Sequence, residues 1–178
     1  FLGRHIVREL LAAYRRAISV DRLPAPAAAP ERVEHVTQTL PGSEFEALLE
    51  AVQPSLLVHA AGAASVPASI ERPGDDFHDS VALYFGVLEA VRKRAPACRV
   101  VFTSSAAVYG NPAVLPVREE ETLAPISPYG FHKMLCEKLG QEYFRLYGIR
   151  NVSARIFSAY GPGLRRQVLW DVCRKALD

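Results

Sequence analysis

Residues 100–110 read Val-Val-Phe-Thr-Ser-Ser-Ala-Ala-Val-Tyr-Gly, residues 127–133 read Ser-Pro-Tyr-Gly-Phe-His-Lys, and together they decide the fold. The apolar run 100–102 predicts a short buried strand, because continuous apolar runs are typical of parallel sheets. Three hydroxyl-bearing residues follow it, and the last of them is Ser105. Ser105 is therefore expected at the carboxyl end of a strand, where parallel sheets place their ligand sites.

The second half of this stretch predicts the start of a helix. Ser127 is a favourable N-cap, and Pro128 suits the first helical position. Tyr129 and Lys133 are then four residues apart, so they lie on the same face of that helix. We therefore expect Ser105, Tyr129 and Lys133 to meet at the carboxyl end of the sheet.

A Ser, a Tyr and a Lys in contact form a general acid/base for interconverting an alcohol and a ketone. The ordinary pKa of Tyr, ~10, is too high for a base at neutral pH, and a neighbouring Lys ammonium is expected to lower it. The hydride must go elsewhere, which implies a nicotinamide cofactor. His132 is the competing base, but it directly precedes Lys133, so on a helix its side chain is expected to point away from that Lys.

The combined motif resembles that of the extended short-chain dehydrogenase/reductases, and within them the nucleotide-sugar epimerases and dehydratases. The resemblance covers nearly the whole chain and implies that Ser105, Tyr129 and Lys133 are catalytic. Strands that alternate with helices independently predict an α/β fold with a parallel, doubly wound sheet. The resemblance adds a Rossmann-like strand order of 3-2-1-4-5-6 and NAD as the cofactor.

The amino terminus fits the end of a dinucleotide-binding fingerprint. Residues 6–14 have the apolar spacing of an amphipathic helix, and a short strand at 17–20 ends at Asp21. Asp21 lies about twenty positions after Gly3, the distance at which an acidic residue binds the adenosine ribose hydroxyls. The resemblance implies that these residues contact the cofactor: Phe1, Leu2, Gly3, Asp21, His59, Ala60, Ala61, Gly62, Ser80, Tyr129, Lys133 and Phe157.

The domain organisation expected from the resemblance is incomplete at both ends. Residues 1–163 form the NAD-binding Rossmann domain without its first strand, which would leave a gap in the middle of the sheet. Residues 164–178 begin a truncated substrate-binding domain. We expect the chain to be part of a protein about twice as long.

Further elements follow from the periodicity of apolar residues. Strands are predicted at 33–37, 56–58 and 152–157, and helices at 45–52, 75–93, 128–147 and about 165–177. The predicted buried faces contain Val81, Tyr84, Phe85 and Leu88 in the second of these helices, and Leu135, Leu139 and Phe144 in the third.

Three positions depart from the pattern that the resemblance implies. Thr39 stands where relatives carry an Asp that holds the adenine, and Ser80 stands where they carry an Asn that supports the active site. Ser158 replaces the Asn of the Asn-x-Tyr-Gly-Pro-Gly turn, and we expect it to contact the substrate together with Ser105. A damaged, non-catalytic NAD-binding member is therefore a second alternative function, against which the intact Ser-Tyr-Lys set argues.

The reaction expected from the resemblance is the 4-epimerisation of a nucleotide sugar through a transient 4-keto intermediate. Dehydratases carry an acid just before the Val-Tyr-Gly segment, where this chain has Ala106 and Ala107, and a methyl group cannot move a proton. The pattern is most similar to that of UDP-hexose 4-epimerases. An NAD(P)-dependent reductase or dehydrogenase, or a 4,6-dehydratase, is the alternative within the same family.

The composition of the chain indicates the cellular compartment of the protein and the classes of partner that it binds. A net charge of +2 gives no support for nucleic acid as a partner, and no apolar run approaches the ~20 residues of a membrane span. Cys98, Cys136 and Cys173 have no metal-binding spacing and indicate free thiols of a reducing compartment, which suits a cytoplasmic enzyme. The resemblance implies a homodimer and a nucleotide-sugar substrate.

Overall fold

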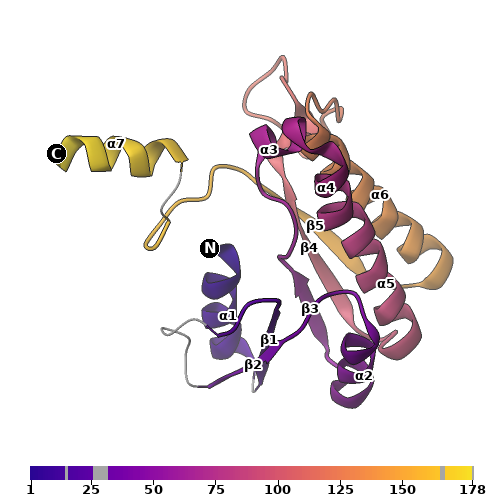
Figure 1. The fold of residues 1–178 in the computed structure, drawn as a ribbon. Helices are drawn as coiled ribbons and strands as arrows, with labels where there is room; N and C mark the ends of the chain where they lie inside the picture. Colours follow the sequence, from indigo (N-terminus) through magenta and orange to yellow (C-terminus); the bar gives the residue numbers. More distant parts are fainter. Residues whose placement is uncertain (15, 26–31, 165–166, 178) are drawn as a thin grey trace.

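The computed structural model describes residues 1–14, 16–25, 32–164 and 167–177. Its strands form two parallel sheets (Figure 1). One sheet pairs β1 (Ala17–Asp21) with β2 (Val33–Thr37), and the other has the order β3 (Leu56–His59), β4 (Arg99–Ser105), β5 (Asn151–Ile156).

The helices lie between these strands in the sequence. They are α1 (Leu2–Ala13), α2 (Ser43–Val52), α3 (Val66–Glu71), α4 (Pro73–Phe77), the π-helical η1 (His78–Ala82), α5 (Leu83–Arg94), the 3₁₀ turn η2 (Ala106–Tyr109), α6 (Pro128–Tyr147) and α7 (Gln167–Leu177). The strands and the helices predicted from the sequence are therefore present. The short elements α3 and η2 were not predicted. The first residues of the predicted C-terminal helix, 165–166, lie outside the described residues.

The division into two sheets agrees with the expected strand order. In the expected order 3-2-1-4-5-6, β1 and β2 take the places of strands 2 and 3, and β3, β4 and β5 take those of strands 4, 5 and 6. None of the described strands takes the place of strand 1. In the described part of the chain, β1 pairs with β2 and β3 pairs with β4, and no ladder joins β1 to β3. Figure 1 shows the two sheets as separate groups, with α1 beside β1 and β2. The fold is thus the predicted parallel α/β arrangement.

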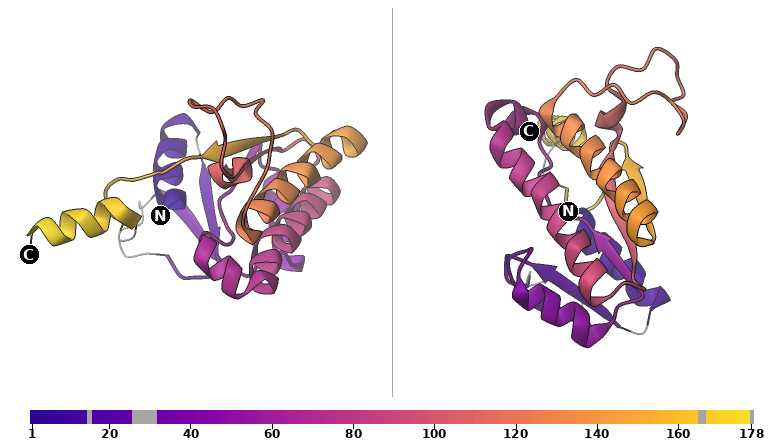
Figure 2. Two further views of the ribbon diagram at one scale, coloured as in Figure 1. Left: turned by 90° about the horizontal axis from the view of Figure 1, so that it is seen from above. Right: turned by 90° about the vertical axis from the view of Figure 1, so that its right-hand side faces the viewer.

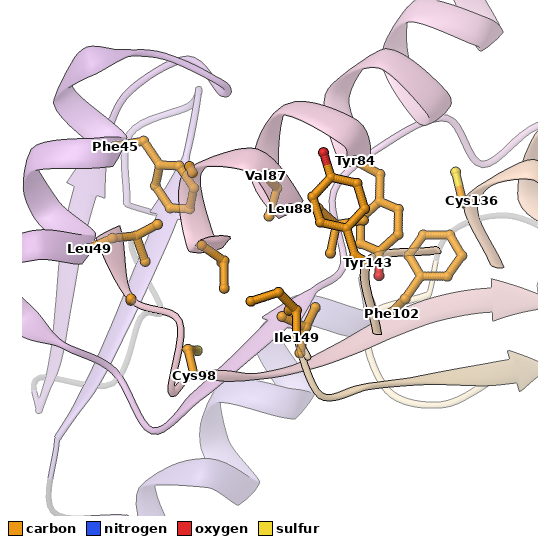
Figure 3. Close-up of a cluster of buried hydrophobic side chains, with 14 of the residues drawn as sticks. Phe45, Leu49, Tyr84, Val87, Leu88, Cys98, Phe102, Cys136, Tyr143 and Ile149 are labelled. Atoms are coloured by element: carbon orange, nitrogen blue, oxygen red, sulfur yellow. The ribbon is translucent and has the colours of Figure 1, made fainter. Parts of the chain in front are cut away.

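The core lies between the three-stranded sheet and the helices α2, α5 and α6, and Figure 2 shows α5 and α6 running side by side. Aromatic side chains from three elements belong to this core: the centres of the Tyr84 and Phe102 rings are 4.4 Å apart, and Tyr143 is buried in the same cluster (Figure 3). Phe45 and Leu49 extend this core under α2. The carboxyl ends of the strands are thereby held on a packed, rigid support.

The predicted buried faces of α5 and α6 are wrong at three positions. Phe85, Leu135 and Phe144 are 47%, 41% and 55% exposed. The buried residues of α6 include Tyr143 and Cys136, and Leu139 packs against the core as predicted. They also include Gly140, where a Cβ would lie only 2.5 Å from the Asn151 side chain. Close approach of the α6 backbone to β5 sets the rotation of this helix, and a count of apolar residues does not detect such an approach.

The predicted helix at 75–93 is longer and is interrupted. It runs from α4 through the π-helical turn η1 into α5, and π-helical turns occur frequently at functional sites. The turn carries Ser80 and Val81 into the interior. None of the helices in the described ranges is both long and apolar enough to span a lipid bilayer.

Candidate active site

The structure brings Ser105, Tyr129 and Lys133 together at the carboxyl end of β4. Ser105 is the last residue of β4, its Oγ accepts a hydrogen bond from the Ala107 N–H at 3.2 Å, and its side chain is close enough to Tyr129 to lower the pKa of that residue. Lys133 lies one turn later on α6, with its Nζ 5.7 Å from the centre of the Tyr129 ring. The Lys133 ammonium donates a hydrogen bond of 3.0 Å to the Thr103 carbonyl oxygen, also on β4. The three residues thus form one contiguous cluster.

The start of α6 is fixed from two sides, and this positions Tyr129. The Ser127 hydroxyl caps the helix by accepting a hydrogen bond from the Gly130 N–H at 3.2 Å, as predicted. The Tyr129 N–H donates to the hydroxyl of Ser69 on α3 at 3.1 Å. A Cβ at Gly130 would lie 2.6 Å from the Ala107 carbonyl oxygen, so only glycine allows the helix to approach η2 this closely.

The electrostatic environment of Tyr129 differs from the sequence-based prediction. Burial raises the pKa of Tyr129, the hydrogen bond to Ser105 lowers it, and the negative charge of Asp76 raises it. The net pKa is raised, so the expected lowering by Lys133 is not seen in this structure. Burial also lowers the pKa of Lys133, while the neighbouring acidic groups of Cys136 and Asp76 raise it. Desolvation thus dominates at both residues.

A second polar pair, which the sequence analysis missed, lies beside this cluster. The Nδ1 atom of His132 is 2.5 Å from Oδ2 of Asp76 on α4. The carboxylate is almost fully buried and the imidazole nearly so. Asp76 and His132 are 56 residues apart in the sequence, and no local spacing signals their contact.

A buried network holds the end of β4 against α6 and β5. The Ser104 hydroxyl donates to Glu137 at 2.6 Å, and the Arg155 guanidinium donates to both carboxylate oxygens of Glu137, the shorter contact being 2.8 Å. Arg155 also donates to the Tyr109 hydroxyl at 2.7 Å and to the Glu119 carbonyl at 2.8 Å. This network joins the strand end to the loop that follows it. Of the residues in this network, only Glu137 could have been predicted from the sequence to lie near the cluster, because it is four residues after Lys133 and therefore on the same face of the helix.

Two of the segments predicted to bind a dinucleotide lie at the carboxyl ends of strands. Asp21 is exposed at the carboxyl end of β1, and its Oδ1 accepts a hydrogen bond from the Leu23 N–H at 3.0 Å. Ala60, Ala61 and Gly62 form an exposed turn of small residues at the end of β3. Gly62 has φ of 121°, and a Cβ there would meet the Asp79 carbonyl oxygen at 2.9 Å, so glycine is required.

Comparisons with known proteins show the family of the chain. The sequence profile of the NAD dependent epimerase/dehydratase family matches residues 1–178. The chain belongs to this family. A UDP-glucose 4-epimerase of Azospirillum brasilense is 32% identical over 164 residues, which are 90% of this chain and 47% of that protein.

Solved structures of the family have the same fold. A UDP-glucose 4-epimerase of Thermus thermophilus in complex with NAD has a TM-score of 0.87 and 30% identity, covering 99% of this chain and 58% of that one. A UDP-glucose 4-epimerase of Brucella ovis in complex with NAD has a TM-score of 0.83 and 30% identity, covering 90% and 50%. The chain spans about half the length of the curated relatives it matches.

The start of α1 lies against the turn that follows β5, through Phe1, Arg4 and His5. The Arg4 guanidinium donates to the Gly163 carbonyl at 3.2 Å, next to Phe1, Leu2 and Gly3. Gly3 lies in the first turn of α1, and a Cβ there would meet nothing within 4 Å. The fingerprint role of Gly3 in this epimerase/dehydratase chain therefore has no steric support in the structure and stays a prediction.

The remaining residues of the predicted site differ in how deeply their side chains are buried. Phe157 and Ser158 are exposed after β5, and the Phe157 ring is 6.3 Å from that of Tyr109. Ser80 is buried, and its hydroxyl oxygen has no hydrogen-bond partner in the described part of the chain. His59 is buried against Tyr84 and Phe102, so its ring is part of the core at the base of the site.

Thr39, which stands where relatives carry the Asp that holds the adenine, differs in burial from its neighbour. Thr39 is exposed, whereas its neighbour Gln38 is buried. The Gln38 N–H donates to the Asp21 carbonyl at 2.8 Å, which places Gln38 beside the predicted ribose-binding residue. The side-chain nitrogen of Gln38 has no partner among the described residues. Gln38, rather than Thr39, is the inward-facing residue at this end of β2.

Proposed function

We propose that this chain carries the cofactor-binding and catalytic part of an NAD-dependent nucleotide-sugar 4-epimerase. The observation that carries the proposal is the contiguous cluster of Ser105, Tyr129 and Lys133 at the carboxyl end of β4. The relatives and solved structures named as UDP-glucose 4-epimerases support the substrate class. The exposed Asp21 at the end of β1 supports NAD, because its carboxylate suits ribose hydroxyls and repels a 2′-phosphate.

Each member of the cluster has a distinct role in this proposal. Tyr129 takes the proton from the sugar 4-hydroxyl and later returns it, and Ser105 hydrogen-bonds the same sugar oxygen. Lys133, whose Nζ is 5.7 Å from the centre of the Tyr129 ring, supplies a positive charge that favours the phenolate, although burial keeps the net pKa of Tyr129 raised in this structure. NAD, when bound, supplies the chemistry of hydride acceptance and return. Carbon 4 of the sugar is inverted because it loses hydride from one face and, as the 4-keto sugar, regains it on the opposite face.

Ala106 and Ala107 favour epimerisation over 4,6-dehydration. They form the first turn of η2, directly after Ser105, and neither side chain can transfer a proton. A reductase or dehydrogenase that consumes its cofactor is the second candidate, because the same acid/base cluster would serve it.

One assay tests the proposal. An extended form of the protein that covers the full length of its relatives is incubated with UDP-glucose and NAD, and UDP-galactose is measured with no added reductant. Interconversion without net production of NADH supports the epimerase, whereas an oxidised sugar that appears only in step with net production of NADH supports a dehydrogenase. Full activity in Tyr129→Phe would refute the catalytic assignment.

We also propose that the protein is a homodimer. Phe85 of α5 and Phe144 and Tyr147 of α6 are large apolar side chains that the structure leaves about half exposed or more. Because α5 and α6 pack side by side, these residues lie on neighbouring helices. Replacing Phe85 and Phe144 by Ser is expected to convert a dimer to a monomer in sedimentation velocity; an unchanged mass would exclude this surface.

A further inference from the structure

Hydrogen bonds on both sides of Ser105 converge on one ion pair. The Ser104 hydroxyl, directly before Ser105, donates to Oε1 of Glu137 at 2.6 Å. Tyr109, which ends η2 after Ser105, accepts a hydrogen bond of 2.7 Å from Nη1 of Arg155. The Arg155 guanidinium in turn donates to Oε2 of Glu137 at 2.8 Å. These side chains close a ring of contacts, the Glu137–Arg155 ring, across the segment that carries Ser105.

The Glu137–Arg155 ring is largely shielded from water. The Glu137 side chain is 3% exposed and the Arg155 side chain 21%, and both Ser104 and Tyr109 are buried. A buried carboxylate is costly unless donors compensate it, and Glu137 receives hydrogen bonds from both Ser104 and Arg155. The guanidinium is planar and its donors form a fixed fork, so it holds its acceptors on Glu137 and Tyr109 at defined positions.

Two consecutive residues of β4 are held by the helix that carries Tyr129. The Lys133 ammonium donates to the carbonyl oxygen of Thr103 at 3.0 Å. Glu137, one helical turn after Lys133, accepts the hydrogen bond from the Ser104 hydroxyl. The end of β4 is therefore fixed relative to α6 immediately before Ser105.

The direction of the Ser105 side chain follows from these fixed neighbours. Successive side chains of a strand point to opposite faces, so a fixed Ser104 determines the side from which Ser105 projects. The chain then enters η2, where the Ala107 N–H donates to the Ser105 hydroxyl at 3.2 Å. Tyr109 ends this turn and is held by Arg155. The turn that orients the Ser105 hydroxyl is therefore fixed at both of its ends.

We propose that the Glu137–Arg155 ring holds Ser105 in the position that the reaction requires, which makes Glu137, Arg155 and Tyr109 positioning residues. This inference rests on the proposed function, in which Ser105 hydrogen-bonds the oxygen of the sugar 4-hydroxyl. The contribution of the ring to kcat passes through Ser105, so it disappears when the Ser105 hydroxyl is removed. An ion pair that only stabilises the fold would contribute equally with and without that hydroxyl.

The test uses Tyr109→Phe in the full-length protein, which removes one hydroxyl and leaves the rest of the side chain. Arg155 keeps its contacts with Glu137 and with the Glu119 carbonyl, so no buried charge loses its partner. Tyr143→Phe is the matched control, because it removes another buried tyrosine hydroxyl that hydrogen-bonds a carboxylate, at 2.8 Å. Tyr109→Phe is expected to lower kcat for UDP-glucose about tenfold, within the ~10²-fold that a misplaced group can cost. Tyr143→Phe is expected to keep the wild-type kcat with a similar fall in melting temperature.

A double-mutant cycle separates positioning from general stability. In a Ser105→Ala background, Tyr109→Phe is expected to lower kcat no further, because the hydroxyl that the ring positions is already absent. Hydrogen exchange measured by mass spectrometry needs no turnover, and over residues 104–109 it is expected to be about tenfold faster in Tyr109→Phe than in wild type or Tyr143→Phe. The same kcat loss in Tyr143→Phe, an equal loss in both Ser105 backgrounds, or unchanged exchange would each overturn the inference. If the full-length protein does not epimerise UDP-glucose, the proposed function fails, and the exchange measurement still decides whether the ring holds the Ser105 turn.

Discussion

His59 is expected to make the stability of the protein fall steeply on acidification. It ends β3 with its side chain buried, its ring 5.1 Å from that of Tyr84 and 6.0 Å from that of Phe102. Burial, and secondarily the positive charge of Lys133, lowers the pKa of His59 from 6.5 to about 4. The folded protein therefore keeps this imidazole neutral over a pH range in which the unfolded chain protonates it.

The sign and the size of the effect follow from that difference. Below pH 6.5 the unfolded state binds a proton that the folded state rejects, so the free energy of unfolding decreases as the pH falls. A pKa difference of this size corresponds to about 2.5 kcal/mol lost between pH 7.5 and pH 4.5. Above pH 7.5 His59 contributes no further pH dependence.

Urea unfolding followed by circular dichroism at intervals from pH 7.5 to 4.5 measures this loss. His59→Phe keeps a ring between Tyr84 and Phe102 but cannot titrate, so its stability is expected to decline less, by about 2.5 kcal/mol over the same range. His78→Phe, at an exposed position, is the matched control and is expected to decline like wild type. Parallel stability curves for wild type and His59→Phe would refute the reasoning.

The remaining predictions concern catalysis, cofactor choice and the buried network. Tyr129→Phe and Lys133→Ala are each expected to lower kcat by about 10²–10⁴-fold, and Ser105→Ala by less because water partly replaces a hydroxyl, as steady-state kinetics would show. Because Asp21 repels a 2′-phosphate, calorimetric titration is expected to give tighter binding of NAD than of NADP, and the reverse order would contradict the assignment. Glu137→Gln breaks a buried ion pair and is expected to cost about 3–5 kcal/mol in urea unfolding, whereas a cost below about 1 kcal/mol would show that Arg155 is satisfied without it.

The main elements of the fold could be predicted from local patterns. The apolar run at 100–102 predicted β4, and the cap residues Ser127 and Pro128 predicted the first residues of α6. These signals are reliable because they depend on neighbours in the sequence: a cap satisfies the N–H groups of its own helix. The meeting of Ser105 and Tyr129 followed from the general rule that parallel strands end at one edge of the sheet.

Helix rotation was less predictable. The apolar residues Leu135 and Phe144 suggested one face of α6, but close packing of Gly140 against Asn151 turned a different face inward. A helix face that contacts another chain has the same apolar pattern as a face that packs in the core, so the sequence pattern does not distinguish the two kinds of face.

The sequence by itself determined the parallel α/β class, the place of the Ser-Tyr-Lys cluster and the family, because each depends on short motifs and on their order along the chain. Only the tertiary structure decided that Asp76 contacts His132 and that Gln38 faces inward instead of Thr39. It also decided that burial, rather than the charge of Lys133, dominates the pKa of Tyr129. Desolvation and long-range contacts depend on which segments pack together, and that information is absent from any single stretch of the chain.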